Sequence, residues 1–323
     1  MSASFNVVPM ALPETAASAD LHDRIRALMD GNRRLSQTKI AAEAGLSSTV
    51  VSQWLNGVYA GDIPAVEAKL WRWVETTQAA REQAAAMPAA PGYVDTATGA
   101  KVIAGLRYAQ LAGDMAVIYG GAGLGKSEAI RRYAHIAPNV WHATMTRASA
   151  NVVTSLEVVV ETLGLGAQGG ANRLYGAICK RVTGTSGLLV IDEAQHLTEA
   201  ALDQIRAIHD ATGIGIALVG NEQVYARMTG GTRAAYLDRL YSRIGKKVRL
   251  IHTTEADVAA LLDGWKVRDP KARALLAEVA SKPGALRGMT KVLRLAGMYA
   301  AAERRALGFD DVRAAWKELG GLE

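Results

Sequence analysis

Hydrophobic residues recur along the chain in three patterns, each typical of a different kind of structure. Residues 20–75 place apolar side chains at helical spacing around a glycine, which predicts short helices joined by a turn. Residues 97–252 alternate helical stretches with short apolar runs, and from Thr254 onward the spacing is helical only. Because helices and strands alternate in the middle segment, we expect a parallel sheet covered by helices. The five expected strands are MAVIYG, NVWHATM, GLLVID, GIALVG and KVRLIH.

These patterns predict an α/β protein with additional helical domains. The stretch TTQAAREQAAAMPAAPGYVDTATG is rich in alanine and polar residues and contains two prolines, so we expect a linker that begins partly helical. The expected segments are a flexible tail at 1–19, an all-α helix-turn-helix domain at 20–75, a linker at 76–96, an α/β core at 97–252 and a C-terminal helical domain at 253–323.

Composition narrows the class of protein. Half of the 323 residues are hydrophobic, which is enough for buried cores in two or three domains. The longest apolar runs are too short to span a bilayer, and the N-terminal sequence lacks the basic and apolar regions of a signal peptide. Cys179 is the single cysteine, so we expect no disulfide framework. These features predict a cytoplasmic protein without a membrane partner.

Charge is distributed unevenly. The chain carries a net charge of +6, and residues 232–252 contain six basic and one acidic side chain, a local net charge of +5. Residues 1–95 contain eight basic and ten acidic side chains, a net charge of −2. The basic segment can attract nucleic acid or nucleotide phosphates. A solvated helix face explains the same charges equally well.

A glycine-rich loop follows the first expected strand and precedes a helix. Within GGAGLGKS, Gly120, Gly125, Lys126 and Ser127 match the phosphate-binding pattern G-x-x-x-x-G-K-[ST]. Backbone N–H groups of such a loop surround phosphates, Lys126 is expected to reach the β- and γ-phosphates of ATP, and Ser127 to ligate Mg²⁺. The alternative is a glycine-rich turn with a chance Lys-Ser pair. The expected ATP-binding residues are Gly120, Gly121, Ala122, Gly123, Leu124, Gly125, Lys126, Ser127 and Asp192.

Polar residues stand at the ends of two later strands. Asp192 ends the apolar run LLVI, at the sheet edge where open parallel sheets bind ligands, and is expected to hold Mg²⁺. Glu193 beside it is the candidate general base for an attacking water. Acids that complement a helix dipole are the alternative. Asn221, after GIGIALVG, could position that water, cap the next helix, or do both.

A second motif lies in LSQTKIAAEAGLSSTVVSQWLNGVYAG. Gly45 falls where the chain must reverse between two helices, and Ser47 or Ser48 is expected to cap the second helix. The pattern resembles the helix-turn-helix of phage repressors, whose second helix enters the major groove of DNA. The negative charge of this block counts against strong phosphate binding, so docking to a protein stays open. The candidate DNA-contacting residues on the second helix are Ser48, Thr49, Ser52 and Gln53.

Taken together, the phosphate loop, the acidic strand end and Asn221 resemble the AAA+ ATPases over about residues 97–300. The resemblance implies a parallel sheet flanked by helices with a C-terminal α-helical lid. It also gives Asn221 the sensor-1 role, and Arg287 in GALR the sensor-2 role on the lid. The run LDRLYSRIG resembles the segment that carries the arginine finger, which acts in trans on a neighbouring subunit. Arg243 is the first candidate for this finger and Arg239 is the second. A surface ion pair or a DNA contact is the alternative for Arg243.

Several longer runs resemble the phage Mu B transposition protein family: IAAEAGLSSTVVSQWLNGVYAGD, GGAGLGKSEAIRRYA, GTSGLLVIDEAQHL and LVGNEQVYARMTGGTR. The resemblance implies an ATPase of a bacterial host cell that polymerises as a helical filament on duplex DNA with little sequence preference. The filament presents target DNA to a transposase, which stimulates hydrolysis and release. Arg147, Lys180 and Arg181 are the DNA-contacting candidates in such a filament. Gln195 stands where some relatives carry Asp, and because it lies outside the metal-binding pair we expect this departure to cause no loss of hydrolysis.

Two other functions remain open from the sequence. A transcription regulator would bind a defined operator through its helix-turn-helix and use the nucleotide only as a switch. A helicase loader shares the same ATPase core but predicts no repressor-like N-terminal domain.

Overall fold

The computed structural model describes residues 16–32, 35–86, 90–229 and 242–321. The chain forms two compact units, Met1–Met87 and Pro88–Glu323, which are described separately below. Within the described residues, no helix is both long enough and apolar enough to cross a membrane.

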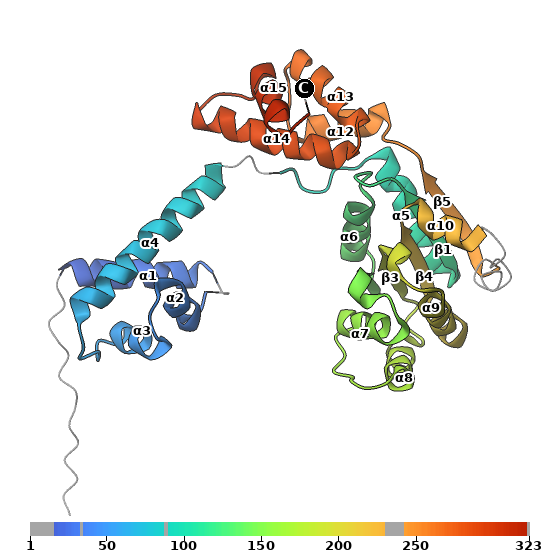
Figure 1. Ribbon diagram of the computed structural model, residues 1–323, viewed down its shortest axis with the longest axis horizontal. Coiled ribbons are helices and arrows are strands. Elements are labelled where there is room, and N and C mark those ends of the chain that lie inside the picture. Colours follow the sequence, from blue (N-terminus) through green and yellow to red (C-terminus); the bar gives the residue numbers. More distant parts are fainter. Residues whose placement is uncertain (1–15, 33–34, 87–89, 230–241, 322–323) are drawn as a thin grey trace, which may run out of the picture. The chain divides into compact units, whose positions relative to one another are not determined.

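The described residues of the N-terminal unit form helices joined by short turns (Figure 1). Buried Leu21, Ile25, Ile40, Trp54 and Leu70 form its core, and each apolar side chain removed from water contributes about 1.5–3 kcal/mol. The four helices are α1 (Ala16–Asp30), α2 (Gln37–Ala44), α3 (Ser48–Leu55) and α4 (Ile63–Ala86).

The turn between α2 and α3 has the local geometry expected from the sequence. Gly45 is left-handed with φ 65°, and its N–H closes the end of α2. The Ser47 side chain accepts a hydrogen bond from the Val50 N–H and so caps α3. Use of this turn in DNA binding stays a prediction.

Helix α4 reaches farther than the expected helical domain. It continues to Ala86 and therefore occupies the first half of the expected linker at 76–96. Alanine has the strongest intrinsic helix propensity, so the Ala-rich stretch extends the helix until Pro88 approaches. The boundary between the two compact units, at Met87, lies inside the same stretch.

The larger unit contains a five-stranded parallel sheet in the order β2-β3-β4-β1-β5, so the predicted α/β class is confirmed. All five expected strands are present: β1 (Met115–Gly120), β2 (Val140–Thr144), β3 (Leu188–Asp192), β4 (Gly215–Gly220) and β5 (Ile244–Leu250). The helices that accompany them are α5 (Ala97–Ala112), α6 (Lys126–Ile136), α7 (Val152–Thr162), α8 (Ala171–Val182), α9 (Glu199–Thr212) and α10 (Glu222–Thr229).

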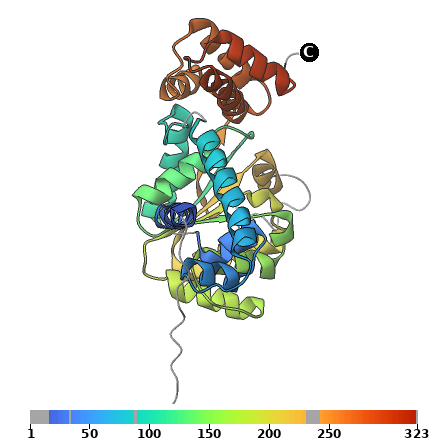
Figure 2. The same ribbon diagram turned by 90° about the vertical axis from the view of Figure 1, so that its left-hand side faces the viewer.

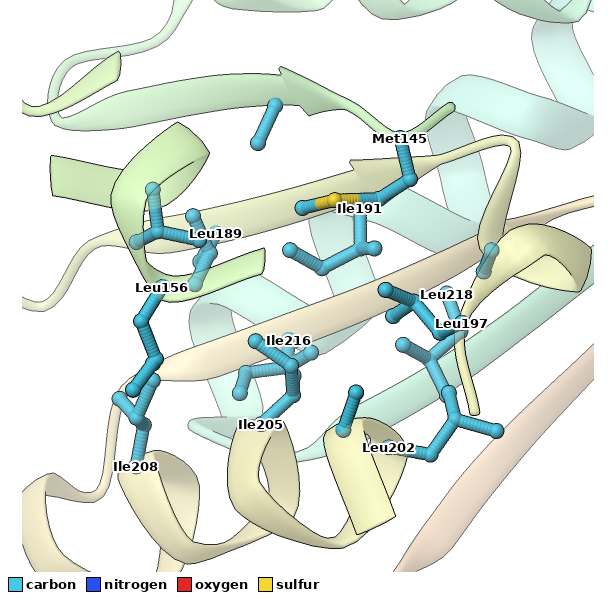
Figure 3. Close-up of a cluster of buried hydrophobic side chains, with 14 of the residues drawn as sticks. Met145, Leu156, Leu189, Ile191, Leu197, Leu202, Ile205, Ile208, Ile216 and Leu218 are labelled. Atoms are coloured by element: carbon cyan, nitrogen blue, oxygen red, sulfur yellow. The ribbon is translucent and has the colours of Figure 1, made fainter. Parts of the chain in front are cut away.

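Alternate residues of each strand face opposite sides of this sheet. Leu189 and Ile191 pack with Leu156 of α7 and Ile205 of α9 in the cluster drawn in Figure 3. Strand residues of the opposite parity pack with α5 and α6. Because both faces are covered, the central strands read as continuous apolar runs. The order β3-β4-β1 also brings the carboxyl ends of these three strands side by side.

Four helices after β5 form a bundle with its own core, coloured orange to red in Figures 1 and 2. Thr254 and Asp257 form a capping box at its start. The fully buried Asp257 carboxylate also accepts hydrogen bonds from the Thr98 N–H at 2.9 Å and the Thr98 hydroxyl at 2.5 Å, which joins the bundle to α5. The helices are α12 (Glu255–Gly264), α13 (Pro270–Ser281), α14 (Ala285–Ala302) and α15 (Phe309–Glu318).

Candidate active site

The glycine-rich loop connects β1 to α6 and has no room for a side chain at two of its positions, Gly120 and Gly123. A Cβ on Gly120 would lie 2.1 Å from the Leu250 carbonyl oxygen of β5. Gly123 has φ 82°, and a Cβ there would lie 2.0 Å from the Gly284 carbonyl oxygen at the start of α14. The loop is therefore shaped by close contact with both the sheet and the lid bundle.

Lys126 begins α6 and turns back over this loop. Its ammonium group donates hydrogen bonds to the carbonyl oxygens of Gly120 at 2.8 Å and Gly121 at 2.7 Å. Burial lowers the pKa of Lys126, and the nearby Arg287 charge lowers it further, against the opposing effect of Asp192 and Glu193. The Lys126 ammonium therefore lies at the same loop as the N-terminus of α6. An ammonium group together with the free N–H groups of a helix N-terminus is a set of donors that fits nucleotide phosphates.

Asp192 meets the loop from the end of β3. Its Oδ2 accepts a hydrogen bond from the Ser127 hydroxyl at 3.0 Å, although the two residues are 65 positions apart. His142 Nε2 of β2 lies 3.3 Å from the same oxygen. Burial alone would raise the pKa of Asp192, but hydrogen bonds from His142, Ser127 and the Glu193 N–H outweigh it and lower the pKa. A buried carboxylate beside a hydroxyl fits Mg²⁺ held jointly with phosphates.

Glu193 occupies an unusual backbone conformation directly after Asp192. It has φ 55° and ψ 36°, the left-handed region that a non-glycine residue adopts at a cost of about 1–3 kcal/mol. Its N–H donates to Asp192 Oδ1 at 2.9 Å, and its own Oε2 accepts a hydrogen bond from the Gln195 amide. Sequence reasoning missed both Gln195 and His142 as members of this site. Gln195 follows Glu193 by two residues, and His142 lies on β2, which pairs with the strand that carries Asp192. These two positions are the signal that could have identified them.

Asn221 lies at the end of β4, next to the acidic strand. Its side-chain oxygen accepts a hydrogen bond from the Gln223 N–H at 2.9 Å and so caps α10. Capping is one of the two roles that the sequence predicted for Asn221, and the other, positioning a water, stays a prediction. Its backbone N–H donates to Gln195 Oε1 at 3.3 Å. Tyr225 of α10 stacks on Tyr119 of β1, with ring centroids 4.6 Å apart and planes 2° apart. These contacts hold α10 against the strands that carry the site.

The three arginine candidates differ in position. Arg287, on the first turn of α14, has its Cβ 3.4 Å from the position of an added Gly123 Cβ, so it lies beside the phosphate loop. Arg243 donates to Asp210 of α9 at 3.0 Å and is half exposed, which is the surface ion pair considered as its alternative. Arg239 lies outside the described residues.

A cavity of about 980 Å³ opens between the phosphate loop and the lid bundle. Its lining is largely apolar and includes Leu124, Ile251, Val258 and Ala277. The size and lining fit a nucleoside beside the phosphate-binding loop.

The residues expected to contact DNA are mostly exposed. Ser48, Thr49 and Gln53 of α3 are exposed and Ser52 is half-buried. In the larger unit, Arg147 and Lys180 are exposed, and the Arg181 guanidinium lies 5.2 Å from the centroid of the Trp141 ring. These positions leave the side chains accessible, and their contact with DNA stays a prediction.

Comparisons with known proteins agree with this geometry. Residues 111–228 match the family model of the AAA domain, and residues 242–319 match that of the Mu B transposition protein, C terminal. The chain is 37% identical over 302 residues to the ATP-dependent target DNA activator B of Escherichia phage Mu, covering 93% of this chain and 95% of the relative. It is 34% identical over 261 residues to the Mu-like prophage FluMu DNA transposition protein B of Haemophilus influenzae, covering 80% of this chain and 90% of that relative.

A solved structure adds information on the fold alone. The structure of Drosophila ORC bound to DNA superimposes with a TM-score of 0.50 at 14% identity, covering 75% of this chain and 65% of that chain. The sheet order, the phosphate loop and both family matches lead to one assignment. The chain belongs to the Mu B transposition protein family, and its core is an AAA+ ATPase domain.

Proposed function

We propose that this chain binds ATP with Mg²⁺, polymerises on duplex DNA, delivers target DNA to a transposase and is released when ATP hydrolysis is stimulated. The relatives' names support the proposal, because they describe an ATP-dependent target DNA activator and a DNA transposition protein. The observation that carries it is the 3.0 Å hydrogen bond between Ser127 and Asp192, since it joins the phosphate loop to the acidic strand at one point.

Each part of the site has a distinct task in ATP binding. The N–H groups of Gly120 to Ser127 and the Lys126 ammonium bind phosphate oxygens, and the cavity beside Leu124 accepts the nucleoside. Ser127 and Asp192 would hold Mg²⁺, which would neutralise charge on the phosphates. Arg287 completes the site from the lid, because α14 starts directly against Gly123.

Hydrolysis uses residues at the neighbouring strand ends. Glu193 takes the proton of the attacking water as general base. Asn221 positions the same water through its amide NH₂, since its side-chain oxygen caps α10. Both roles require only groups at the carboxyl ends of β3 and β4.

An arginine from a neighbouring subunit is expected to complete catalysis. Arg243 is the first candidate and Arg239 the second. The exposed pair of Arg243 with Asp210 contributes about 0–1 kcal/mol, so exchanging Asp210 for a neighbour's phosphate costs little. Hydrolysis would then depend on oligomerisation, and the filament on DNA is the form that turns over ATP.

DNA binding depends on exposed cations of the larger unit and on α3. Arg147, Lys180 and Arg181 supply charge for the phosphate backbone, which favours binding without strong sequence preference. The polar residues of α3 carry no charge and contribute less to this binding.

Electron microscopy of the protein on several unrelated linear duplexes tests this function, with ATP, with ADP and without nucleotide. Filaments on every duplex with ATP alone are the expected result. Discrete particles at one site, or DNA binding that is indifferent to nucleotide, would instead favour the operator-binding regulator and overturn the filament.

A further inference from the structure

Gln195 links two groups of the candidate active site that come from different strands. It lies in the short 3₁₀ helix Ala194–His196 after β3 and is 9% exposed. Its amide nitrogen donates to Glu193 Oε2, and its amide oxygen accepts from the Asn221 N–H at 3.3 Å. One side chain therefore contacts both the candidate base and the end of β4.

These two partners fix the orientation of the Gln195 amide. A backbone N–H can only donate, so the amide oxygen must face Asn221. An ionised carboxylate can only accept, so the NH₂ group must face Glu193. The two requirements agree, and a rotated amide would lose both hydrogen bonds at once.

The end of β4 leaves space for this amide. A Cβ added at Gly220 would lie 2.3 Å from Gln195 Oε1 and 2.5 Å from a Val224 methyl carbon. Gly220 is therefore required for the close approach of Gln195. The amide is enclosed between the turn after β3 and the first turn of α10.

The orientation of the Glu193 carboxylate depends on a hydrogen-bond donor from another residue. Its backbone is in the left-handed region, and its side chain is half exposed. The neighbouring Asp192 carboxylate, which accepts the Glu193 N–H, carries the same negative charge as the Glu193 carboxylate and repels it. The Gln195 NH₂ is the donor that holds Oε2 in one place.

We propose that Gln195 is a positioning residue that orients the Glu193 carboxylate toward the attacking water and couples its orientation to the β4–α10 junction. This inference rests on the proposed function, because it assumes that Glu193 is the general base. Misplacement of a reacting group by about 1 Å costs on the order of 100-fold in rate, so loss of this donor has a measurable effect.

The test compares steady-state ATP hydrolysis by full-length variants in the presence of duplex DNA. Gln195→Met keeps the volume of the side chain and removes both hydrogen bonds. We expect kcat to fall at least about tenfold while KM for ATP stays within about twofold. Gln168→Met, at an exposed glutamine between α7 and α8, is the matched control and keeps wild-type kcat. Wild-type kcat in Gln195→Met would overturn the inference.

Gln195→Glu separates the two hydrogen bonds. It keeps an acceptor for the Asn221 N–H but replaces the donor to Glu193 with a second carboxylate. We expect a loss of kcat at least as large as that of Gln195→Met, with unchanged thermal unfolding in the presence of ATP. A kcat loss that appears only together with loss of folded protein or of ATP affinity would show a merely structural role.

A double-mutant cycle distinguishes this inference from the proposed function. If Gln195 acts through Glu193, Gln195→Met has no further effect on kcat in a Glu193→Gln background. A further loss there contradicts the inference. Wild-type turnover in Glu193→Gln alone removes the assumed base and so overturns the proposed function itself, whatever Gln195→Met does.

Discussion

The carboxyl edge of the sheet and the exposed face of α3 both present short polar side chains, but their surroundings differ. At the sheet edge, Ser127 and Asp192 come from distant parts of the chain and are fixed by contacts with each other. On α3, Thr49 and Gln53 are neighbours in sequence and face outward. Converging, partly buried groups define a chemistry by themselves, whereas an exposed polar face acquires a role only from its partner.

Among the changes at the carboxyl edge of the sheet, substitution of Lys126 is expected to have the largest effect on ATP binding. Lys126→Ala removes the ammonium that the glycine loop encloses, so ATP binding and ATP-dependent assembly on DNA should fall below detection. Binding of a fluorescent ATP analogue and microscopy on duplex DNA measure this. Lys101→Ala, at an exposed lysine of α5, is the control and should assemble normally. ATP-dependent filaments of Lys126→Ala would contradict the phosphate-binding role of the loop.

A substitution of Glu193 at the same edge should have a smaller effect, because it should slow ATP hydrolysis without preventing ATP binding. Glu193→Gln keeps the shape of the side chain but removes the proposed base, so turnover should fall by about 100-fold or more while ATP still binds. The complexes on DNA should then persist instead of dissociating. Phosphate release and filament lifetime measure the two properties. Glu157→Gln on the exposed face of α7 should behave as wild type. A wild-type rate in Glu193→Gln would show that another group is the base.

Short runs of sequence determine the local geometry of the candidate site, for a physical reason. The run GGAGLGKS determines its own loop geometry, and an apolar run ending in Asp192 must bring that acid to the sheet edge. Convergence of Ser127 with Asp192 follows from the rule that parallel strands end together. Strands β1, β3 and β4 were recognisable because fully buried strands are continuously apolar.

What the sequence did not reveal depends on contacts between segments. The role proposed for Gln195 depends on its hydrogen bond with Asn221 and on Gly220 having no side chain. Gln195 comes close to these two residues only because β3 pairs with β4. The Arg243–Asp210 pair joins residues 33 positions apart on different elements. The linker was expected to begin partly helical, but the residue at which α4 ends, Ala86, could not be read from the alanine-rich run alone.

The junction between sheet and lid offers a test at the level of stability. Asp257→Asn places an NH₂ group where Oδ2 accepts from Thr98 and Thr254, and should lower the free energy of unfolding by about 1–3 kcal/mol at pH 7. Burial would raise the pKa of Asp257, but hydrogen bonds from Thr98 and Thr254 outweigh it and lower the pKa. Its contribution is therefore complete above the unfolded pKa of about 3.9 and is lost as pH falls through the lower folded pKa.

Thermal unfolding from pH 7 to pH 3 measures this contribution. The difference in Tm between wild type and Asp257→Asn should be constant at neutral pH and shrink below about pH 4. Asp263→Asn is the control, because its carboxylate is 69% exposed. Equal Tm values for wild type and Asp257→Asn at pH 7 would mean that the joint between α5 and α12 does not stabilise the fold.

The smallest expected effect compares charge on the larger unit with polarity on α3. Arg181→Ala removes one cation, so if Arg181 contacts a phosphate, the dependence of log K on log salt should weaken by about one. Gln53→Ala removes no charge and should leave that slope unchanged, because an amide displaces no counterion. Fluorescence anisotropy with one duplex, repeated over a range of salt concentrations, gives both slopes. Equal slopes for Arg181→Ala and wild type would remove Arg181 from the DNA interface. A preference for one duplex sequence that Gln53→Ala abolishes would make α3 a sequence reader and reverse the ranking of the two regions.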